Sequence, residues 1–149
     1  MFLENPAYNN EQFGWIEVIC GSMFSGKTEE LIRRIKRVKI ANQKFKVFKP
    51  TLDSRSKNYI ESHDESKLKS TEVKHSSDIL NNIQGCAVVA IDEAQFFDNE
   101  IVSVCNQLAN KGIRVIVAGL DMDYLGNPFG PIPNLMAIAE YVTKVHAVC

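Results

Sequence analysis

The glycine, lysine and hydroxyl residues in positions 21–28 have the spacing needed to hold a chain of phosphates. The segment fits the pattern Gly-x-x-x-x-Gly-Lys-Ser/Thr, the P-loop. Its glycines let the backbone curl so that successive N–H groups point at phosphate oxygens, while the lysine reaches the β- and γ-phosphates and the hydroxyl holds Mg²⁺. We therefore predict a nucleoside triphosphate site at Gly21, Ser22, Met23, Phe24, Ser25, Gly26, Lys27 and Thr28.

The flanking residues argue against a chance match to this pattern. Residues 15–20 form an apolar run typical of a buried strand. Residues 29–41 have helical periodicity, and the apolar side of that helix carries Leu31, Ile32, Ile35 and Val38. A strand before the loop and a helix after it are the setting that a P-loop requires.

A second candidate segment follows residues 87–91, a continuous apolar run that predicts a strand buried on both faces of a parallel sheet. The run ends on Asp92 and Glu93. Asp92 matches the Walker-B carboxylate that holds Mg²⁺ opposite Thr28. Glu93 would then lie beside the γ-phosphate, where it could take a proton from an attacking hydroxyl or water. The alternative is that both acids only favour the next helix through its dipole.

Further candidate residues follow other predicted strands. Asp53 and Arg55 come after the strand predicted at residues 45–49, and Arg55 could neutralise developing phosphoryl charge unless it is an ordinary exposed loop arginine. Aromatic residues in neighbouring loops could hold a planar base, although core packing would explain them equally well; they are Phe96, Phe97, Tyr124 and Phe129.

Strands that alternate with helices predict how these groups are positioned. We expect an α/β fold with a P-loop NTPase-type parallel sheet flanked by helices. Ligands in such sheets bind beyond the carboxyl ends of the strands, where residues 21–28, Asp92 and Asp121 all emerge. The expected strands are residues 15–20, 45–49, 71–74, 87–91, 113–120 and 142–148. The expected helices are residues 29–41, a short helix capped by Ser77 or Asp78, residues 99–110 with Asp98 as the N-cap, and residues 134–141. Loops are expected at residues 53–69 and 121–133.

The composition of the whole chain indicates an ordinary globular protein of one domain. Its 149 residues carry a formal net charge of -1 and contain no apolar stretch long enough to cross a membrane. The N-terminus lacks a signal-peptide pattern and the four cysteines show no close pairing, so we expect a cytoplasmic location without a nucleic-acid or membrane partner. The basic residues between 33 and 39 should form a solvated helix face, and Cys20, Cys86 and Cys105 should be buried.

Four motifs together resemble those of the thymidine kinase family of the cellular and bacterial type. They are residues 21–28, 53–55, 92–97 and 119–130, in this order and spacing. Each motif is shared with other P-loop proteins, whereas the combination is specific. The resemblance extends from about Gly14 to the last residue.

The resemblance implies an ATP-dependent phosphotransferase that moves the γ-phosphate of ATP to the 5′-hydroxyl of thymidine, giving dTMP for DNA precursor supply. It implies Glu93 as the general base, Mg²⁺ on Thr28 and Asp92, and stabilisation of the moving charge by Lys27 and Arg55. Besides the P-loop, the residues implied to contact ATP are Asp92, Glu93, Ala94 and Gln95. Those implied to surround the nucleoside are Met23, Asp53, Phe96, Leu120, Tyr124 and Phe129. The family is usually homotetrameric, so a homotetramer is expected.

The family also carries a small zinc-binding lobe after its nucleotide-binding domain, built on Cys-x-x-Cys and a later pair of ligands. Cys149 matches the first ligand, and the other three would lie beyond it. Because one thiolate cannot make a tetrahedral zinc site, we expect structural zinc only in the complete protein. The expected layout is an N-terminal extension at residues 1–13, a P-loop kinase domain at residues 14–148, and the start of a truncated zinc lobe at Cys149.

Three alternatives fit parts of the pattern. Residues 92–95 resemble the Walker-B box of helicases, but helicases need two such domains and a nucleic-acid track. A GTP-dependent switch would select guanine with Asn-Lys-x-Asp, and residues 110–113 lack the aspartate. A kinase for a different small acceptor stays open, because some of the residues that choose the acceptor would lie beyond Cys149.

Overall fold

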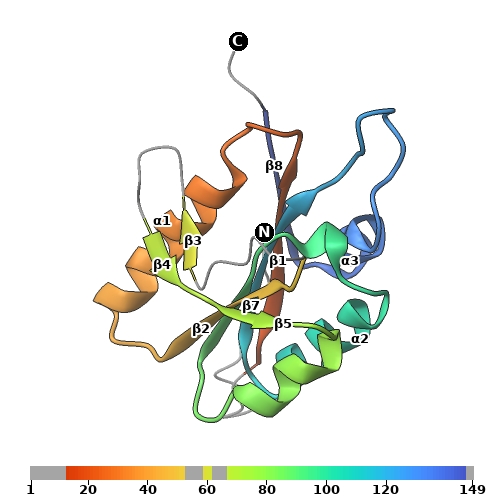
Figure 1. The fold of residues 1–149 in the computed structure, drawn as a ribbon. Coiled ribbons are helices and arrows are strands. Elements are labelled where there is room, and N and C mark those ends of the chain that lie inside the picture. Colours follow the sequence, from red (N-terminus) through yellow and green to blue (C-terminus); the bar gives the residue numbers. More distant parts are fainter. Residues whose placement is uncertain (1–12, 53–58, 62–66, 147–149) are drawn as a thin grey trace.

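A parallel sheet forms the centre of the structure. The computed structural model describes residues 13–52, 59–61 and 67–146, and within them six strands pair in the order β5-β2-β6-β7-β1-β8 (Figure 1). Every pairing in this sheet is parallel. The strands are β1 (Trp15–Gly21), β2 (Phe45–Pro50), β5 (Thr71–Val73), β6 (Val88–Ile91), β7 (Arg114–Leu120) and β8 (Tyr141–Val145).

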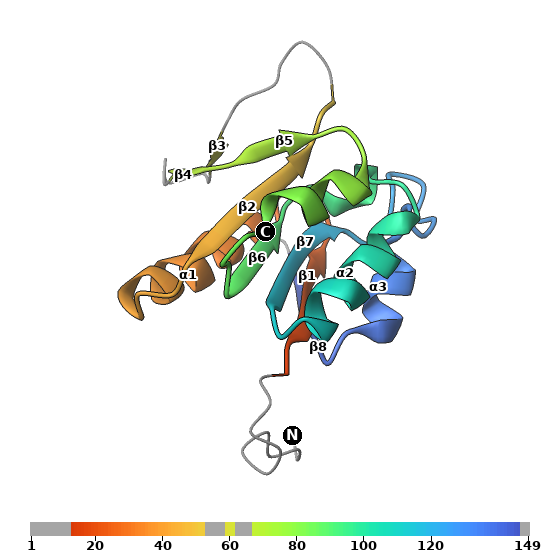
Figure 2. The same cartoon turned by 90° about the horizontal axis from the view of Figure 1, so that it is seen from below.

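Helices cover both faces of the sheet, as an all-parallel sheet requires. Helix α1 (Lys27–Ile40) lies on one face, and α2 (Glu100–Asn110), α3 (Ile132–Ile138) and the 3₁₀ helix η2 (Ser76–Asn82) lie on the other (Figure 2). A 3₁₀ turn, η3 (Ala94–Phe96), follows β6. The architecture confirms the predicted α/β class with a parallel sheet flanked by helices.

Helix α1 is held on the sheet by apolar residues that recur at helical spacing. Leu31, Ile32, Ile35 and Val38 are buried, as the sequence predicts. They belong to the same cluster as Ile19 of β1. Burial of a side chain of this size stabilises the fold by about 1.5–3 kcal/mol before ordering entropy is counted. The strand that enters the P-loop and the helix that leaves it are therefore fixed to each other.

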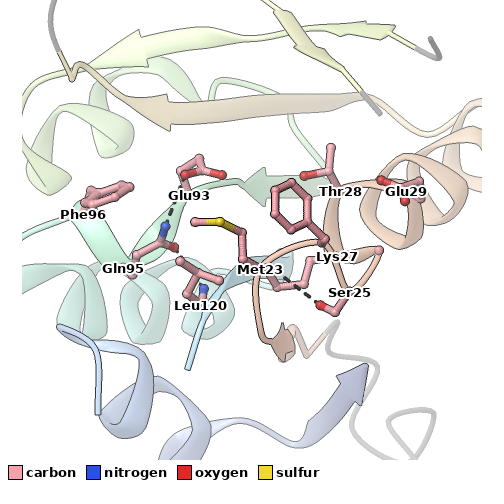
Figure 3. A pocket seen from close by; sticks show the side chains of 11 residues that line it. Met23, Ser25, Lys27, Thr28, Glu29, Glu93, Gln95, Phe96 and Leu120 are labelled. Atoms are coloured by element: carbon pink, nitrogen blue, oxygen red, sulfur yellow. Dashed lines mark hydrogen bonds between the residues drawn. The ribbon is translucent and has the colours of Figure 1, made fainter. Parts of the chain in front are cut away.

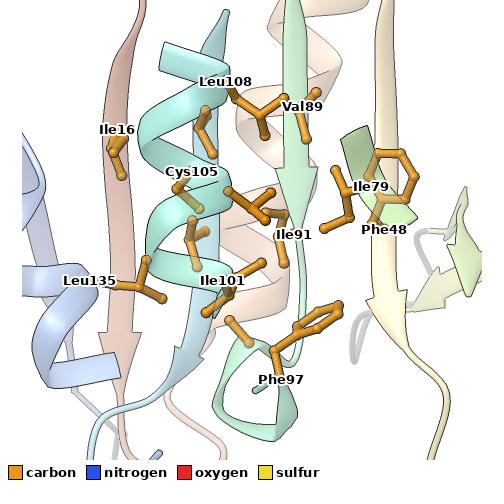
Figure 4. Packing of buried hydrophobic residues seen from close by; sticks show 14 of the residues in the cluster. Ile16, Phe48, Ile79, Val89, Ile91, Phe97, Ile101, Cys105, Leu108 and Leu135 are labelled. Carbon is orange, nitrogen blue, oxygen red and sulfur yellow. The ribbon is translucent and has the colours of Figure 1, made fainter. Parts of the chain in front are cut away.

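The opposite face of the sheet packs against α2. Ile101, Cys105 and Leu108 of that helix share a cluster with Ile16 of β1 and Ile91 of β6 (Figure 4). Strand β6 is buried along its whole length, which explains its uninterrupted apolar sequence. Because β6 contacts helices on both sides, the position at which it ends is well defined.

Two expectations from composition can be compared with the structure. Cys20, Cys86 and Cys105 are buried, as predicted, and burial raises the pKa of the Cys105 thiol to about 12. Within the described part of the chain, no helix combines the length and the apolar character needed to span a membrane.

A hairpin lies between β2 and β5, where composition predicts a loop over residues 53–69. β3 (Tyr59–Glu61) pairs antiparallel with β4 (Lys67–Lys69). Leu68 of β4 is buried in the cluster under α1. The larger apolar residues of this polar segment, Tyr59, Ile60 and Leu68, show no period that could indicate a strand. The prediction of a loop is therefore wrong at residues 59–61 and 67–69.

The starts of two short helices also differ from the predicted ones. The N-cap of η2 is His75 rather than Ser77 or Asp78, and the Asp78 carboxylate accepts a hydrogen bond from the His75 N–H at 3.1 Å. Helix α3 begins before residue 134 and includes Pro133, which the sequence analysis placed in a loop. Proline is accepted in the first turn of a helix because no intrahelical bond is needed from its nitrogen.

Asp98 connects two elements instead of acting as the N-cap of α2, a position that Asn99 occupies. Its Oδ1 atom accepts hydrogen bonds from the Glu100 N–H at 3.0 Å and from the Ser76 hydroxyl at 2.8 Å. The carboxylate thus joins the start of η2 to the start of α2.

A buried carboxylate joins β1 and β7 to α1. Glu17 is 6% exposed and accepts hydrogen bonds from Arg34 at 2.8 Å, from Arg114, and from Trp15 Nε1 at 2.6 Å. Burial alone would raise the pKa of Glu17, but the hydrogen bonds from Arg114 and Trp15 and the charges of both arginines outweigh it and lower the pKa. Ionised Glu17 therefore stabilises the folded chain at neutral pH.

We predict that Glu17→Gln lowers the free energy of unfolding at neutral pH by about 3 kcal/mol, because both arginines lose a buried partner. The pKa of Glu17 is lowered from 4.5, so its contribution is present above that value and is lost as the pH falls below it. Urea unfolding over this pH range should show a gap between the two proteins that narrows on acidification.

The comparison variant is Glu30→Gln, which breaks the ion pairs with Arg33 and Arg34 within α1 at a carboxylate that is more exposed than that of Glu17. Its effect should stay below about 1 kcal/mol. A gap for Glu17→Gln that did not change with pH would contradict the assignment.

Candidate functional site

The carboxyl ends of three neighbouring strands meet at one edge of the sheet, where ligands of such folds bind. Residues 21–28 follow β1, Asp92 follows β6, and Asp121 follows β7. A pocket of about 220 Å³ opens there (Figure 3). Its walls are Met23, Phe24, Ser25, Gly26, Lys27, Thr28, Glu29, Glu93, Gln95, Phe96 and Leu120.

The P-loop backbone turns sharply into α1. Gly26 is the N-cap of the helix and has a φ of 91°. Phe24 also has a positive φ of 62°, which is uncommon for a residue with a side chain. Among the described residues, no side chain caps α1. The N–H groups of its first turn and the positive end of its dipole therefore lie at the pocket, an arrangement that favours phosphate oxygens.

Lys27 lies over the loop to which it belongs. Its Nζ donates hydrogen bonds to the Ser22 carbonyl at 2.7 Å and to Ser25 Oγ at 3.4 Å. Partial burial lowers the pKa of Lys27, and the charges of Glu93 and Asp92 oppose that shift. The ammonium is thus placed between the loop and the two acids, where phosphate oxygens would be held.

Asp92 faces Thr28, a residue of the pocket wall. The Thr28 hydroxyl lies 3.5 Å from Asp92 Oδ2, and Asp92 is 6% exposed. Burial, together with the neighbouring charge of Glu93, raises the pKa of Asp92 to about 7. A hydroxyl and a carboxylate are ligands that Mg²⁺ accepts, and a cation there would offset the cost of a buried negative charge. In the described residues no group of three or more His, Cys, Asp or Glu could hold a metal, so phosphates and water would have to supply the remaining ligands.

Glu93 occupies a strained backbone position at the mouth of the pocket. Its φ of 55° and ψ of 38° are left-handed, and such residues are often found at functional sites. The Glu93 N–H donates to Asp92 Oδ1 at 2.9 Å, and Glu93 Oε2 accepts from Gln95 Nε2 at 3.2 Å. The second bond ties the Glu93 carboxylate to Gln95, which also lines the pocket (Figure 3).

The apolar wall contains some of the residues expected around a nucleoside. Met23, Phe96 and Leu120 line the pocket. Phe129 meets the Phe96 ring edge to face, with ring centroids 5.5 Å apart. Tyr124 is 94% exposed and is not among the lining residues.

Other expected residues have different places. Phe97 is buried in the core, which supports the packing alternative for that residue. Ala94 is buried in the same cluster. Asp53, Arg55 and Cys149 lie outside the described residues.

Glu29, which was not among the predicted site residues, lines the pocket from the first turn of α1. Its position directly after Thr28 was the available signal. An ion pair of Asp121 with Lys144 was also not predicted. The Asp121 carboxylate is buried and lies 2.7 Å from Lys144 Nζ on β8, and this contact raises the pKa of Lys144.

The loop after β7 packs against η3 through a close backbone contact. Gly130 has a φ of 52°, and a Cβ atom there would lie 2.4 Å from the Gln95 carbonyl oxygen. Gly126 in the same loop has a φ of 82°, but no atom lies within 4 Å of its Cβ position. A side chain at either position would have a strained backbone, but only a side chain at position 130 would also be crowded by neighbouring atoms. Substitutions at the two positions can therefore distinguish the effect of strain from that of crowding.

Sequence comparisons relate this chain to proteins of one family. The model of the thymidine kinase family matches residues 14–149. The chain is 57% identical over 150 residues to the thymidine kinase of Bacteroides thetaiotaomicron, covering 100% of this chain and 75% of the relative. It is 61% identical over 137 residues to that of a Rhodothermus species, covering 91% and 64%, and 55% identical over 148 residues to that of Porphyromonas gingivalis, covering 99% and 72%.

We predict that Gly130→Ala destabilises the fold more than Gly126→Ala. Both substitutions place a side chain at positive φ, but only the methyl group added at position 130 would crowd the Gln95 backbone, which should lower the unfolding free energy by about 1–3 kcal/mol more. Thermal unfolding followed by circular dichroism would measure the difference. Equal melting temperatures for the two variants would contradict the contact.

Proposed function

The chain belongs to the thymidine kinase family, and from that premise we propose that it transfers the γ-phosphate of ATP to the 5′-hydroxyl of thymidine, giving dTMP and ADP. The observation that carries this proposal is that Lys27, Thr28 and Glu93 line one pocket that also has an apolar wall, with Asp92 Oδ2 3.5 Å from the Thr28 hydroxyl. The groups that would bind phosphate, hold the metal and accept the proton then lie together with an apolar surface for a planar nucleobase. This is what phosphoryl transfer needs, because its catalysis depends mainly on positioning and charge.

In the proposed complex, the triphosphate lies on the P-loop and the first turn of α1. Backbone N–H groups and the Lys27 ammonium bind its oxygens, so Lys27 exchanges the Ser22 carbonyl for phosphate. Thr28 and Asp92 would hold Mg²⁺, which neutralises phosphate charge and orients the oxygens when it is bound. Arg55 is proposed to add charge stabilisation.

In the proposed transfer step, Glu93 accepts the proton of the 5′-hydroxyl as the oxygen attacks the γ-phosphorus. The bond between that phosphorus and the bridging oxygen breaks, and ADP leaves with the electron pair. Glu93 already lines the pocket before this step. Positioning of this kind is the main contribution that the chain makes.

The nucleoside is proposed to lie against Met23, Phe96 and Leu120, with Phe129 packed edge to face against Phe96. A flat, neutral base is held well by apolar walls with a few polar contacts. Asp53 and Tyr124 are proposed as further contacts on the family resemblance alone, and so are the ATP contacts of Ala94 and Gln95.

Family membership also supports proposals about the whole protein. We include among them a kinase domain at residues 14–148 after an extension at residues 1–13, a zinc site that uses Cys149, a homotetramer, and a cytoplasmic location. These statements rest on the resemblance of motifs and not on geometry. The matched relatives are longer than the aligned segment, which spans 64–75% of their length.

We predict that Glu93→Gln lowers the rate of dTMP formation by about 10²–10⁴-fold, the range for loss of a general base. ATP binding should stay within about threefold of the wild type, because phosphate contacts are attributed to the loop. The assay incubates the chain with ATP, Mg²⁺ and a panel of nucleosides and separates the products. Retention of most of the rate would remove Glu93 as the base, and ADP release without any phosphorylated nucleoside would point to an ATPase instead.

We expect Lys27→Ala to weaken both ATP binding and transfer, because the ammonium contacts the phosphates in the ground state and in the transition state. Equilibrium titration with ATP and steady-state kinetics would measure the two effects. Lys36→Ala, on the exposed side of α1, is the control and should change neither. Unaltered ATP affinity in Lys27→Ala would show that the P-loop assignment is wrong.

A further inference from the structure

The side-chain amide of Gln95 is buried between two parts of the site. Gln95 is 4% exposed. Its Nε2 donates to Glu93 Oε2 at 3.2 Å, and its Oε1 accepts from the Leu120 N–H at 3.1 Å (Figure 3). Buried amides are normally hydrogen-bonded at both ends, and here both bonds go to protein groups that line the pocket.

The two partners fix the orientation of this amide. A backbone N–H can only donate, so Leu120 must face Oε1. An ionised carboxylate can only accept, so Glu93 must face Nε2. The amide therefore cannot rotate by half a turn without losing both bonds, and its donor is permanently directed at Glu93.

The fold leaves space for this side chain by using glycine on two sides. A Cβ at Gly119 would lie 2.9 Å from Gln95 Oε1 and 2.6 Å from Ile132 Cδ1. A Cβ at Gly130 would lie 2.4 Å from the Gln95 carbonyl oxygen. Both the side chain and the backbone of Gln95 are thus enclosed by β7 and by the loop that follows it.

The Glu93 carboxylate needs a partner outside its own residue to fix its orientation. It has a left-handed conformation directly after β6, and a glutamate side chain has up to about 2 kcal/mol of rotamer entropy to lose when it is fixed. The charge of Lys27 attracts the Glu93 carboxylate and that of Asp92 repels it. Within the described residues, the hydrogen bond that orients this carboxylate comes from Gln95.

We propose that Gln95 is a positioning residue: its amide holds the Glu93 carboxylate at a fixed place relative to Leu120 and so aligns the base with the nucleoside pocket. This inference rests on the proposed function, in which Glu93 is the base. It replaces the ATP contact that the family resemblance alone implies for Gln95. A residue that contacts ATP affects the KM for ATP, whereas a residue that orients the base affects kcat.

The test measures kcat and KM in the full chain for Gln95→Met and Gln95→Glu. Gln95→Met keeps the length and removes both bonds. Gln95→Glu keeps an acceptor for the Leu120 N–H but replaces the donor with a carboxylate beside Glu93. Gln107→Met, an exposed position on α2, is the matched control and should behave like the wild type.

We expect both Gln95 variants to lower kcat by about 10–100-fold, the size expected for a small misplacement of a catalytic group, while the KM for ATP changes by less than about threefold. Circular dichroism identifies any variant that fails to fold, and the isosteric Gln95→Glu then decides the question. A kcat within about threefold of the wild type in either folded variant would overturn the inference. A raised KM for ATP with unchanged kcat would also overturn it, in favour of a nucleotide contact.

The controls separate this inference from the proposed function. If the wild type makes no dTMP, or if Glu93→Gln is as active as the wild type, the proposed function fails and the inference fails with it. If the wild type is active and Glu93→Gln is inactive, while the Gln95 variants keep their kcat, only the role of Gln95 is wrong.

Discussion

The parallel pairing of β6, β7 and β1 is the constraint on which the rest of the structure depends. Because these adjacent strands run in the same direction, their carboxyl ends meet at one edge, and the P-loop, Asp92 and Leu120 emerge together. Parallel strands must be covered on both faces, which explains why β6 and most of β7 are apolar without alternation. The chemistry of the pocket is thus positioned by hydrogen bonds and packing that lie outside it.

The site combines groups that are costly to keep close together. Asp92 is buried next to Glu93, which is why the pKa of Asp92 is raised to about 7, and Glu93 and Phe24 have backbone conformations that are uncommon for residues with side chains. Packing elsewhere must compensate for this, and the two apolar clusters on either side of the sheet are the source of that stability. A rigid scaffold that supports a strained site is typical of proteins that bind or transform a ligand.

The sequence predicts the parts of this arrangement that depend on short-range patterns. Neighbouring residues in the chain suffice to predict the loop at residues 21–28, the buried face of α1 and the two acids after β6. The structure confirms the strands and the helix from which these features were predicted. The contact of Gln95 with Leu120 joins residues 25 positions apart, and no local pattern indicates it. Tyr124 and Phe129 illustrate the same limit, since both are aromatic residues of one loop but only Phe129 approaches the site. The hairpin β3–β4 was missed because Leu68 finds its partners under α1 and not in its own segment.

The first glycine of the P-loop is also a packing residue. A Cβ atom at Gly21 would lie 2.2 Å from the Val145 carbonyl oxygen of β8, so the edge strand approaches the loop too closely for any side chain. Selection for folding alone would therefore preserve Gly21, even in a descendant that had lost the ability to bind a nucleotide. In this fold, a glycine at the first position of the motif is evidence for close packing of β8 against the loop. Only Lys27 and Thr28 make the motif evidence for nucleotide binding.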